Sequence, residues 1–143
     1  MKSTPKVTKQ ITVFVGLVVH SGKLLMVKRD EPEVKGAHLK WEIPGGKVDF
    51  GETPEESIVR EIKEETGVNV KVKGLLPTIY TKYWDYPWGV QHTLLFGYEC
   101  EFISQGEKIP DHHVNDVAWV ELEEIKKLKR LPGVDFFLKA LLA

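Results

Sequence analysis

The 143-residue sequence predicts an α/β protein in which a mixed β-sheet carries helices on its faces. Apolar, β-branched runs bounded by turn residues indicate more strands than helices. The helical patterns are spread along the chain and are not grouped in one part of it. No internal repeat and no Gly-, Ser- or Pro-rich linker divides the sequence. We therefore expect one domain, residues 11–143, preceded by a flexible segment of residues 1–10.

The first two expected strands form a hairpin. Residues 11–20 and 23–29 are largely apolar, and the turn residues Ser21 and Gly22 join them. Further strands are expected at residues 68–75, 79–83, 92–102 and 117–121, and helices at residues 54–66, 122–128 and 134–142.

The helix at residues 54–66 has clear boundaries in the sequence. Thr53 is a suitable N-cap, Pro54 suits the first helical position, and Glu56 completes a capping box with Thr53. Gly67 is a typical residue to end the helix.

Composition excludes several classes of function. A net charge of −1 gives no overall attraction to nucleic acid or to an anionic membrane. The apolar run at residues 11–19 is too short to span a bilayer. Cys100 is the only cysteine, which excludes an internal disulfide and fits the reducing cytoplasm. We therefore expect a cytoplasmic protein with a small-molecule partner.

Three glutamates of the helix, Glu61, Glu64 and Glu65, form an arc beside its apolar stripe. Like charges at this spacing cost about 0.2 to 0.5 kcal/mol per pair. One interpretation is a solvated acidic face that Arg60 and Lys63 relieve. The other is that the carboxylates hold a hard divalent cation such as Mg²⁺.

The loop before the helix, "IPGGKVDFGE", places Gly45 and Gly46 close to its start. Glycine allows a backbone to approach a ligand closely. A plain turn is the alternative interpretation of this pair.

Taken together, the loop and the helix resemble the Nudix hydrolase family, whose box reads G-x5-E-x7-R-E-U-x-E-E-x-G-U with U apolar. All nine defined positions are filled, by Gly46, Glu52, Arg60, Glu61, Ile62, Glu64, Glu65, Gly67 and Val68.

The resemblance implies an α/β/α sandwich and a Mg²⁺-dependent hydrolase of nucleoside diphosphate-linked substrates, with Mn²⁺ as a substitute ion. The implied metal ligands are Glu61, Glu64, Glu65 and the Gly45 carbonyl, while Glu52 and Arg60 orient the site. Glu61 also matches the general base of some family members, whereas others take the base from a late loop.

Fewer residues point to the substrate. Arg29 is placed like a family arginine that binds phosphate, or else is a surface charge. Trp84 and Tyr86 can stack a nucleobase, or else belong to the core or a dimer interface. Asp116 is the expected late-loop metal ligand.

We therefore expect a nucleoside triphosphate pyrophosphohydrolase that releases a nucleoside monophosphate and pyrophosphate. Hydrolysis of ADP-ribose or of dinucleoside polyphosphates is the nearest alternative, and a nucleotide-binding regulator without turnover is an alternative of another class. Exposed aromatic residues and the apolar C-terminal segment allow a homodimer. No nucleic acid or membrane partner is expected.

Overall fold

The structure is a computed structural model that describes residues 7–111 and 113–143. In chain order the elements are β1 (Thr8–His20), β2 (Lys23–Arg29), β3 (Trp41–Glu42), β4 (Gly45–Gly46), α1 (Pro54–Thr66), β5 (Val68–Tyr86), β6 (Gly89–Gln105), β7 (Val114–Glu121), the 3-10 helix η1 (Leu122–Lys127) and α2 (Pro132–Leu141).

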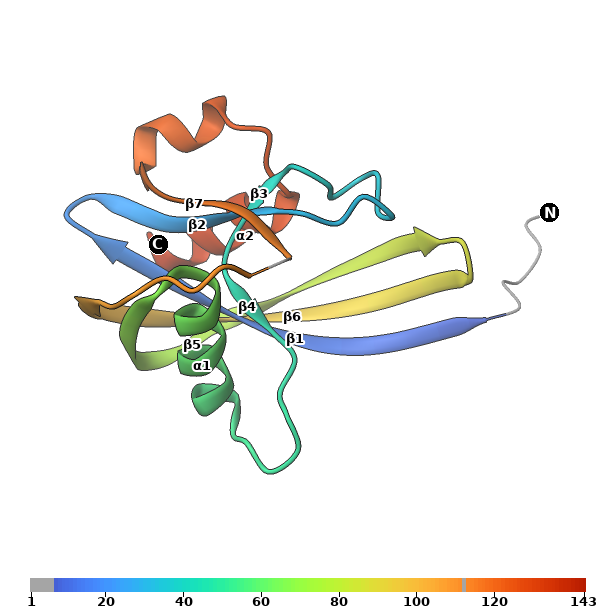
Figure 1. Cartoon of the computed structure of the whole chain (residues 1–143), viewed down its shortest axis with the longest axis horizontal. Helices are drawn as coiled ribbons and strands as arrows, with labels where there is room; N and C mark the ends of the chain where they lie inside the picture. Colours follow the sequence, from blue (N-terminus) through green and yellow to red (C-terminus); the bar gives the residue numbers. More distant parts are fainter. Residues whose placement is uncertain (1–6, 112) are drawn as a thin grey trace.

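The strands form one mixed sheet, in the order β3-β2-β1-β6-β5 (Figure 1). β4 pairs with β1, and β7 pairs with β2. The long pairing of β1 with β6 is parallel, and the other strand pairs are antiparallel. The predicted mixed sheet is confirmed.

The two α-helices cover opposite faces of this sheet (Figure 1). Ile58 and Ile62 of α1 are fully buried in one apolar cluster, which Leu25 of β2 joins from the sheet. Phe137 of α2 is fully buried in a second cluster with Met26, the next residue of β2. Because successive strand residues face opposite sides, the two clusters lie on either side of the sheet, as an α/β/α sandwich requires.

One end of the sheet extends beyond both helices (Figure 1). This extension, here called the ribbon, consists of residues 8–13 of β1, 80–86 of β5 and 89–95 of β6. β6 is its central strand, since it pairs with β1 on one side and with β5 on the other.

The first hairpin and the bounds of α1 are as predicted. β5 is one continuous strand where two were expected, because the chain passes Pro77 by a register shift between Leu75 and Ile79. β3 and β4 were missed, since strands of two residues have no detectable periodicity. None of the described helices is long and apolar enough to cross a membrane.

The predicted flexible segment, residues 1–10, is too long. β1 begins at Thr8, and its first residues pair with Val90, Gln91 and His92 of β6. This pairing gives hydrogen-bond partners to the backbone of residues 8–10, whose polar side chains did not predict a strand. Residues 1–6 lie outside the part of the chain that the structure describes.

Gly97 of β6 is expected to be essential for the packing of α2. A Cβ atom at this position would lie 2.6 Å from Cδ1 of the fully buried Phe137. Gly97→Ala should therefore lower the free energy of unfolding by about 1 to 3 kcal/mol, measured by urea denaturation. Gly74→Ala is the matched control, because the Cβ that it adds would meet no atom within 4 Å. Equal midpoints for Gly97→Ala and the wild type would contradict this packing argument.

Candidate active site

A cleft of about 930 Å³ runs from the start of the box to the ribbon. At one end it is lined by Gly45, Gly46, Glu61 and Glu65 of the box region, together with Glu42 of β3. Arg29 of β2 lies between the two ends, close enough to Glu42 and to Tyr86 to interact with both. At the other end it is lined by ribbon side chains, among them Tyr80, Trp84, Tyr86, Trp88, Gln91 and Thr93. The cleft therefore joins an acidic end to an aromatic end.

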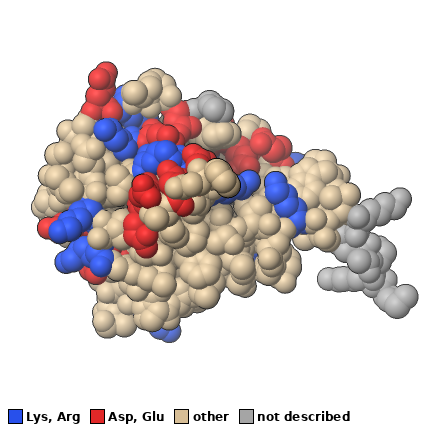
Figure 2. Space-filling view, turned by 90° about the horizontal axis from the view of Figure 1, so that it is seen from below, with Lys and Arg blue, Asp and Glu red and all other residues tan. Residues whose placement is uncertain are grey.

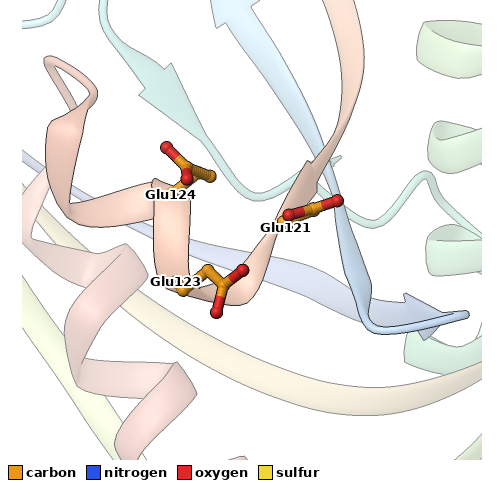
Figure 3. Close-up of side chains that lie close together, drawn as sticks. All are labelled: Glu121, Glu123 and Glu124. Atoms are coloured by element: carbon orange, nitrogen blue, oxygen red, sulfur yellow. The ribbon is translucent and has the colours of Figure 1, made fainter.

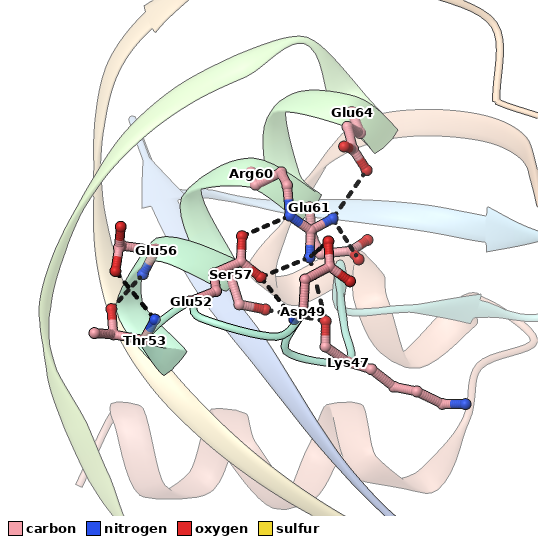
Figure 4. Close-up of polar contacts among 9 residues, drawn as sticks. All are labelled: Lys47, Asp49, Glu52, Thr53, Glu56, Ser57, Arg60, Glu61 and Glu64. Atoms are coloured by element: carbon pink, nitrogen blue, oxygen red, sulfur yellow. Dashed lines mark hydrogen bonds and ion pairs between the residues drawn. The ribbon is translucent and has the colours of Figure 1, made fainter.

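Helix α1 is held at both of its ends. The Glu56 N–H donates to the Thr53 hydroxyl at 3.1 Å, and the Thr53 N–H donates to the Glu56 carboxylate at 3.0 Å (Figure 4). Gly67 ends the helix in the left-handed conformation, with φ of 79°. The predicted capping box and stop are confirmed, and they fix the register of the acidic residues between them.

Arg60 connects three of the box glutamates (Figure 4). Its guanidinium donates two hydrogen bonds to Glu52, at 2.7 and 2.9 Å. The same group donates to Glu61 at 3.0 Å and to Glu64 at 3.2 Å. The bond to the Lys47 carbonyl, at 3.2 Å, also ties the loop to the helix. Bidentate contacts of this kind fix geometry as well as charge.

The two glycines allow the loop to lie directly against the acidic arc. A Cβ atom at Gly46 would lie 2.6 Å from the carboxyl carbon of Glu61. The Gly45 N–H donates to Glu65 at 3.1 Å. A side chain at Gly46 would therefore displace the Glu61 carboxylate, and one at Gly45 would clash with the backbone of Phe14. The Gly45 carbonyl as a metal ligand remains a prediction.

The acidic end concentrates carboxylates that repel one another. Burial, and then the nearby charges of Glu42 and Glu61, raise the pKa of Glu65 well above its ordinary value. Burial also raises the pKa of Glu61 and, with the charge of Glu31, that of Glu42, which reaches about 7. Such a set of hard oxygen donors is suited to a divalent cation, which would reverse the repulsion.

The three glutamates of the arc differ in their surroundings. Glu61 and Glu65 line the cleft, and the Glu61 side chain is only 19% exposed. Glu64 is 54% exposed and is joined to Glu61 by their shared contact with Arg60. A solvated acidic face describes Glu64 but does not describe Glu61 or Glu65.

Arg29 reaches the cleft at the end of β2. Its guanidinium forms an ion pair with Glu31 and lies 3.4 Å from a carboxylate oxygen of Glu42. The pKa of Arg29 is raised, because these two charges outweigh the opposing effect of burial. Its side chain therefore lines the cleft as a paired charge, and its binding of phosphate remains a prediction.

Trp84 and Tyr86 are both partly buried in the cleft wall. They pack against a small cluster formed by Val34, Ala37 and Leu131. Tyr86 also stacks on Trp88, with ring centroids 5.1 Å apart. The structure thus places both predicted stacking residues in the wall of one cleft, where each has a structural role as well.

Asp116 does not line this cleft. It is exposed on β7, and its carboxylate accepts a hydrogen bond from the Val117 N–H at 2.8 Å. Asp111, in the loop before β7, lies close enough to raise the pKa of both Glu61 and Glu65. Asp116 as a metal ligand stays a prediction, and Asp111 is the acid of this region whose charge acts on the box glutamates.

Charged residues elsewhere do not form a comparable site in the part of the chain that the structure describes. On the face of the molecule shown in Figure 2, acidic and basic side chains are interspersed. Glu121, Glu123 and Glu124 lie together where β7 meets η1 (Figure 3), with potential ligand atoms within 4.8 Å of one another. All three are exposed, and Glu124 forms an ion pair with Lys127 at 2.9 Å. This group is not part of the cleft.

Two sequence relatives each match less than half of this chain. The ADP-ribose pyrophosphatase of Methanocaldococcus jannaschii is 49% identical over 61 residues, which are 43% of this chain and 34% of that protein. The 8-oxo-dGTP diphosphatase of Escherichia coli is 37% identical over 60 residues, which are 42% of this chain and 46% of that protein. The matched part thus spans less than half the length of either relative.

Solved structures show the same fold over nearly the whole chain. The MutT NUDIX hydrolase from Burkholderia pseudomallei has a TM-score of 0.75 and 24% identity, covering 93% of this chain and 98% of that chain. A NUDIX hydrolase from Nitrosomonas europaea has a TM-score of 0.76 and 23% identity, covering 93% and 88%. The family model of the NUDIX domain matches residues 9–140. This chain therefore belongs to the Nudix hydrolase family.

Proposed function

We propose that this protein is a Mg²⁺-dependent pyrophosphohydrolase that converts a nucleoside triphosphate to a nucleoside monophosphate and pyrophosphate. The observation that carries the proposal is the single cleft that has carboxylates at one end and aromatic side chains at the other. A nucleotide has the matching chemistry, with an anionic chain at one end and a flat base at the other. Relatives that act on nucleotides support the same class of substrate.

Glu61, Glu64 and Glu65 are the proposed ligands of Mg²⁺, for which Mn²⁺ can substitute. The ion would neutralise phosphate charge and make an attacking water more acidic. Arg60 holds Glu61 and Glu64 in place, and Glu52 holds Arg60. Arg29 is proposed to contact a phosphate oxygen from the opposite wall of the cleft.

In the proposed reaction, the oxygen of water forms a bond to phosphorus while the α–β anhydride bond breaks. Pyrophosphate leaves, and the proton of the water passes to a carboxylate. Glu61 from α1 and Asp111 from the late loop are the two candidates for this base. Glu61 lines the acidic end of the cleft, and Asp111 lies close enough to raise the pKa of Glu61 and Glu65.

Two other functions keep specific support. The 49% identity with an ADP-ribose pyrophosphatase favours ADP-ribose as a second substrate candidate. Tyr86 falls where a family tyrosine is associated with dinucleoside polyphosphates. A nucleotide-binding regulator without turnover is the alternative of another class.

We also propose a cytoplasmic location, where the buried thiol of Cys100 stays reduced. A homodimer remains an expectation.

The substrate is tested by a panel assay with Mg²⁺ that contains common and oxidised nucleoside triphosphates, ADP-ribose and diadenosine polyphosphates. We expect pyrophosphate from one triphosphate at a much higher kcat/KM than from the other compounds. Separation of the products by chromatography identifies the bond that breaks. Preferred release of AMP and ribose 5-phosphate from ADP-ribose would replace the proposal, and binding without turnover would favour the regulator.

The acidic arc is tested by charge removal. Glu61→Gln, Glu64→Gln and Glu65→Gln should each lower kcat by at least ~100-fold, because each removes a proposed metal ligand or base. Chelation should abolish activity, and Mg²⁺ or Mn²⁺ should restore it. Glu123→Gln is the matched control, since it alters the exposed glutamate group outside the cleft. Full activity of both Glu64→Gln and Glu65→Gln, or loss in the control, would contradict the metal assignment.

The Glu52–Arg60 pair predicts a pH dependence of stability. Hydrogen bonds from Arg60 lower the pKa of Glu52 from 4.5 to about 2. A lowered pKa stabilises the folded state above pH 4.5, and this contribution is lost as the pH falls towards 2. Glu52→Gln should therefore unfold at lower denaturant concentration than the wild type at pH 7, with a difference that shrinks between pH 4.5 and 2. A constant difference over that range would count against the pair.

A further inference from the structure

The central strand of the ribbon places two uncharged polar side chains next to each other in a part of the cleft wall that also contains aromatic, apolar and lysine side chains. These are Gln91 and Thr93 of β6. Cross-strand pairing gives each of them neighbours on both sides, and directly paired side chains share a face of the sheet. The neighbours of Gln91 are Lys9 and Trp84, and those of Thr93 are Ile11 and Lys82.

Thr93 is unusual among the buried polar residues that the structure describes. The others are Ser57 and Thr66, whose hydroxyls donate to backbone carbonyls and thereby support α1 and the loop before it. The Thr93 oxygen instead accepts a hydrogen bond from the side-chain amide of Gln91, at 3.2 Å. This arrangement leaves the hydroxyl proton of Thr93 available as a donor within the cleft wall.

Gln91 is oriented by two neighbours. Its amide nitrogen donates to Thr93, and its side chain also hydrogen-bonds Tyr86. A primary amide has two donor hydrogens and two acceptor lone pairs, so Gln91 keeps hydrogen-bonding capacity beyond these two contacts. This capacity and the hydroxyl proton of Thr93 lie side by side, next to the indole of Trp84 on the adjacent strand, over which the Lys82 ammonium lies 5.2 Å from the ring centroid.

We infer that Gln91 and Thr93 bind the hydrogen-bonding edge of the substrate's nucleobase and determine which base the protein prefers. Every nucleobase offers a donor and an acceptor along one edge and a flat face for stacking, so the pair and Trp84 match its chemistry. The inference rests on the proposed function, because it takes the ligand to be a nucleotide whose phosphates lie at the acidic end of the same cleft.

The alternative is that Gln91 and Thr93 only stabilise the ribbon by bonding to each other. A ligand without a base separates the two roles. Inorganic tripolyphosphate has the phosphates of the substrate but no base to meet the ribbon. Loss of a base contact should leave its binding unchanged, whereas a distorted cleft would weaken the binding of every ligand.

The experiment measures dissociation constants by calorimetry for ATP, GTP, CTP, UTP and tripolyphosphate, with Ca²⁺ in place of Mg²⁺ to slow turnover. The variants are Gln91→Met and Thr93→Val, which keep side-chain size and remove the polar groups. We expect the wild type to prefer one base by about tenfold or more. Each variant should reduce that preference to less than about threefold and bind tripolyphosphate within about twofold of the wild type.

Thr81→Val is the matched control, because Thr81 is exposed and pairs with Leu94, one residue from Thr93 in β6 and therefore on the opposite face of the ribbon. It should leave all five constants unchanged. A base preference that survives both variants, no preference in the wild type, or equal weakening of tripolyphosphate and nucleotides would each overturn the inference. Parallel kcat/KM measurements with Mg²⁺ separate it from the proposed function, which fails if no nucleoside triphosphate is turned over, whatever the base preference in binding.

Discussion

The geometry of the acidic end depends on the guanidinium of Arg60. It is the group through which the loop residues Lys47 and Glu52 are joined to Glu61 and Glu64 of the helix. Arg60 and Arg29 together do not neutralise every carboxylate at this end, because the partly buried carboxyls of Glu65 and Glu42 keep raised pKa values. The site thus contains two fixed positive charges and is still short of positive charge. This imbalance is the physical reason to expect a bound cation.

Much of the fold followed from local sequence signals. The bounds of α1 agreed with the prediction because the capping box and Gly67 act within a few residues of each helix end. The sheet was harder to predict. Residues 41–42 and 45–46 become strands only through their partners, and β5 passes Pro77 because the register shifts there. None of these features can be seen in a window of sequence.

The residues of the site were likewise predictable only where they are close together in the sequence. Box residues within one helix and its preceding loop were predictable, since their spacing places them on one side. Glu42 and Asp111 join them only because the tertiary fold brings β3 and a late loop to the same place. Gln91 and Thr93 gave no signal in the sequence, since an alternating strand of this composition predicts only that one face is partly buried. Their place in the cleft wall depends on β1 and β5, which pair with β6 on its two sides.

The parallel pairing of β1 with β6 has a consequence for how the chain folds. Gln10 and His92, which are paired in the sheet, are 82 positions apart in the sequence. Pairing strands so far apart in the sequence is slow, because the entropy of closing the long loop is lost before the strand contacts stabilise it. During synthesis, β1 and its hairpin partner must wait for the central strand to leave the ribosome, with apolar surface exposed in the meantime. The aromatic end of the cleft, to which β6 contributes Gln91 and Thr93, would therefore be completed late in synthesis.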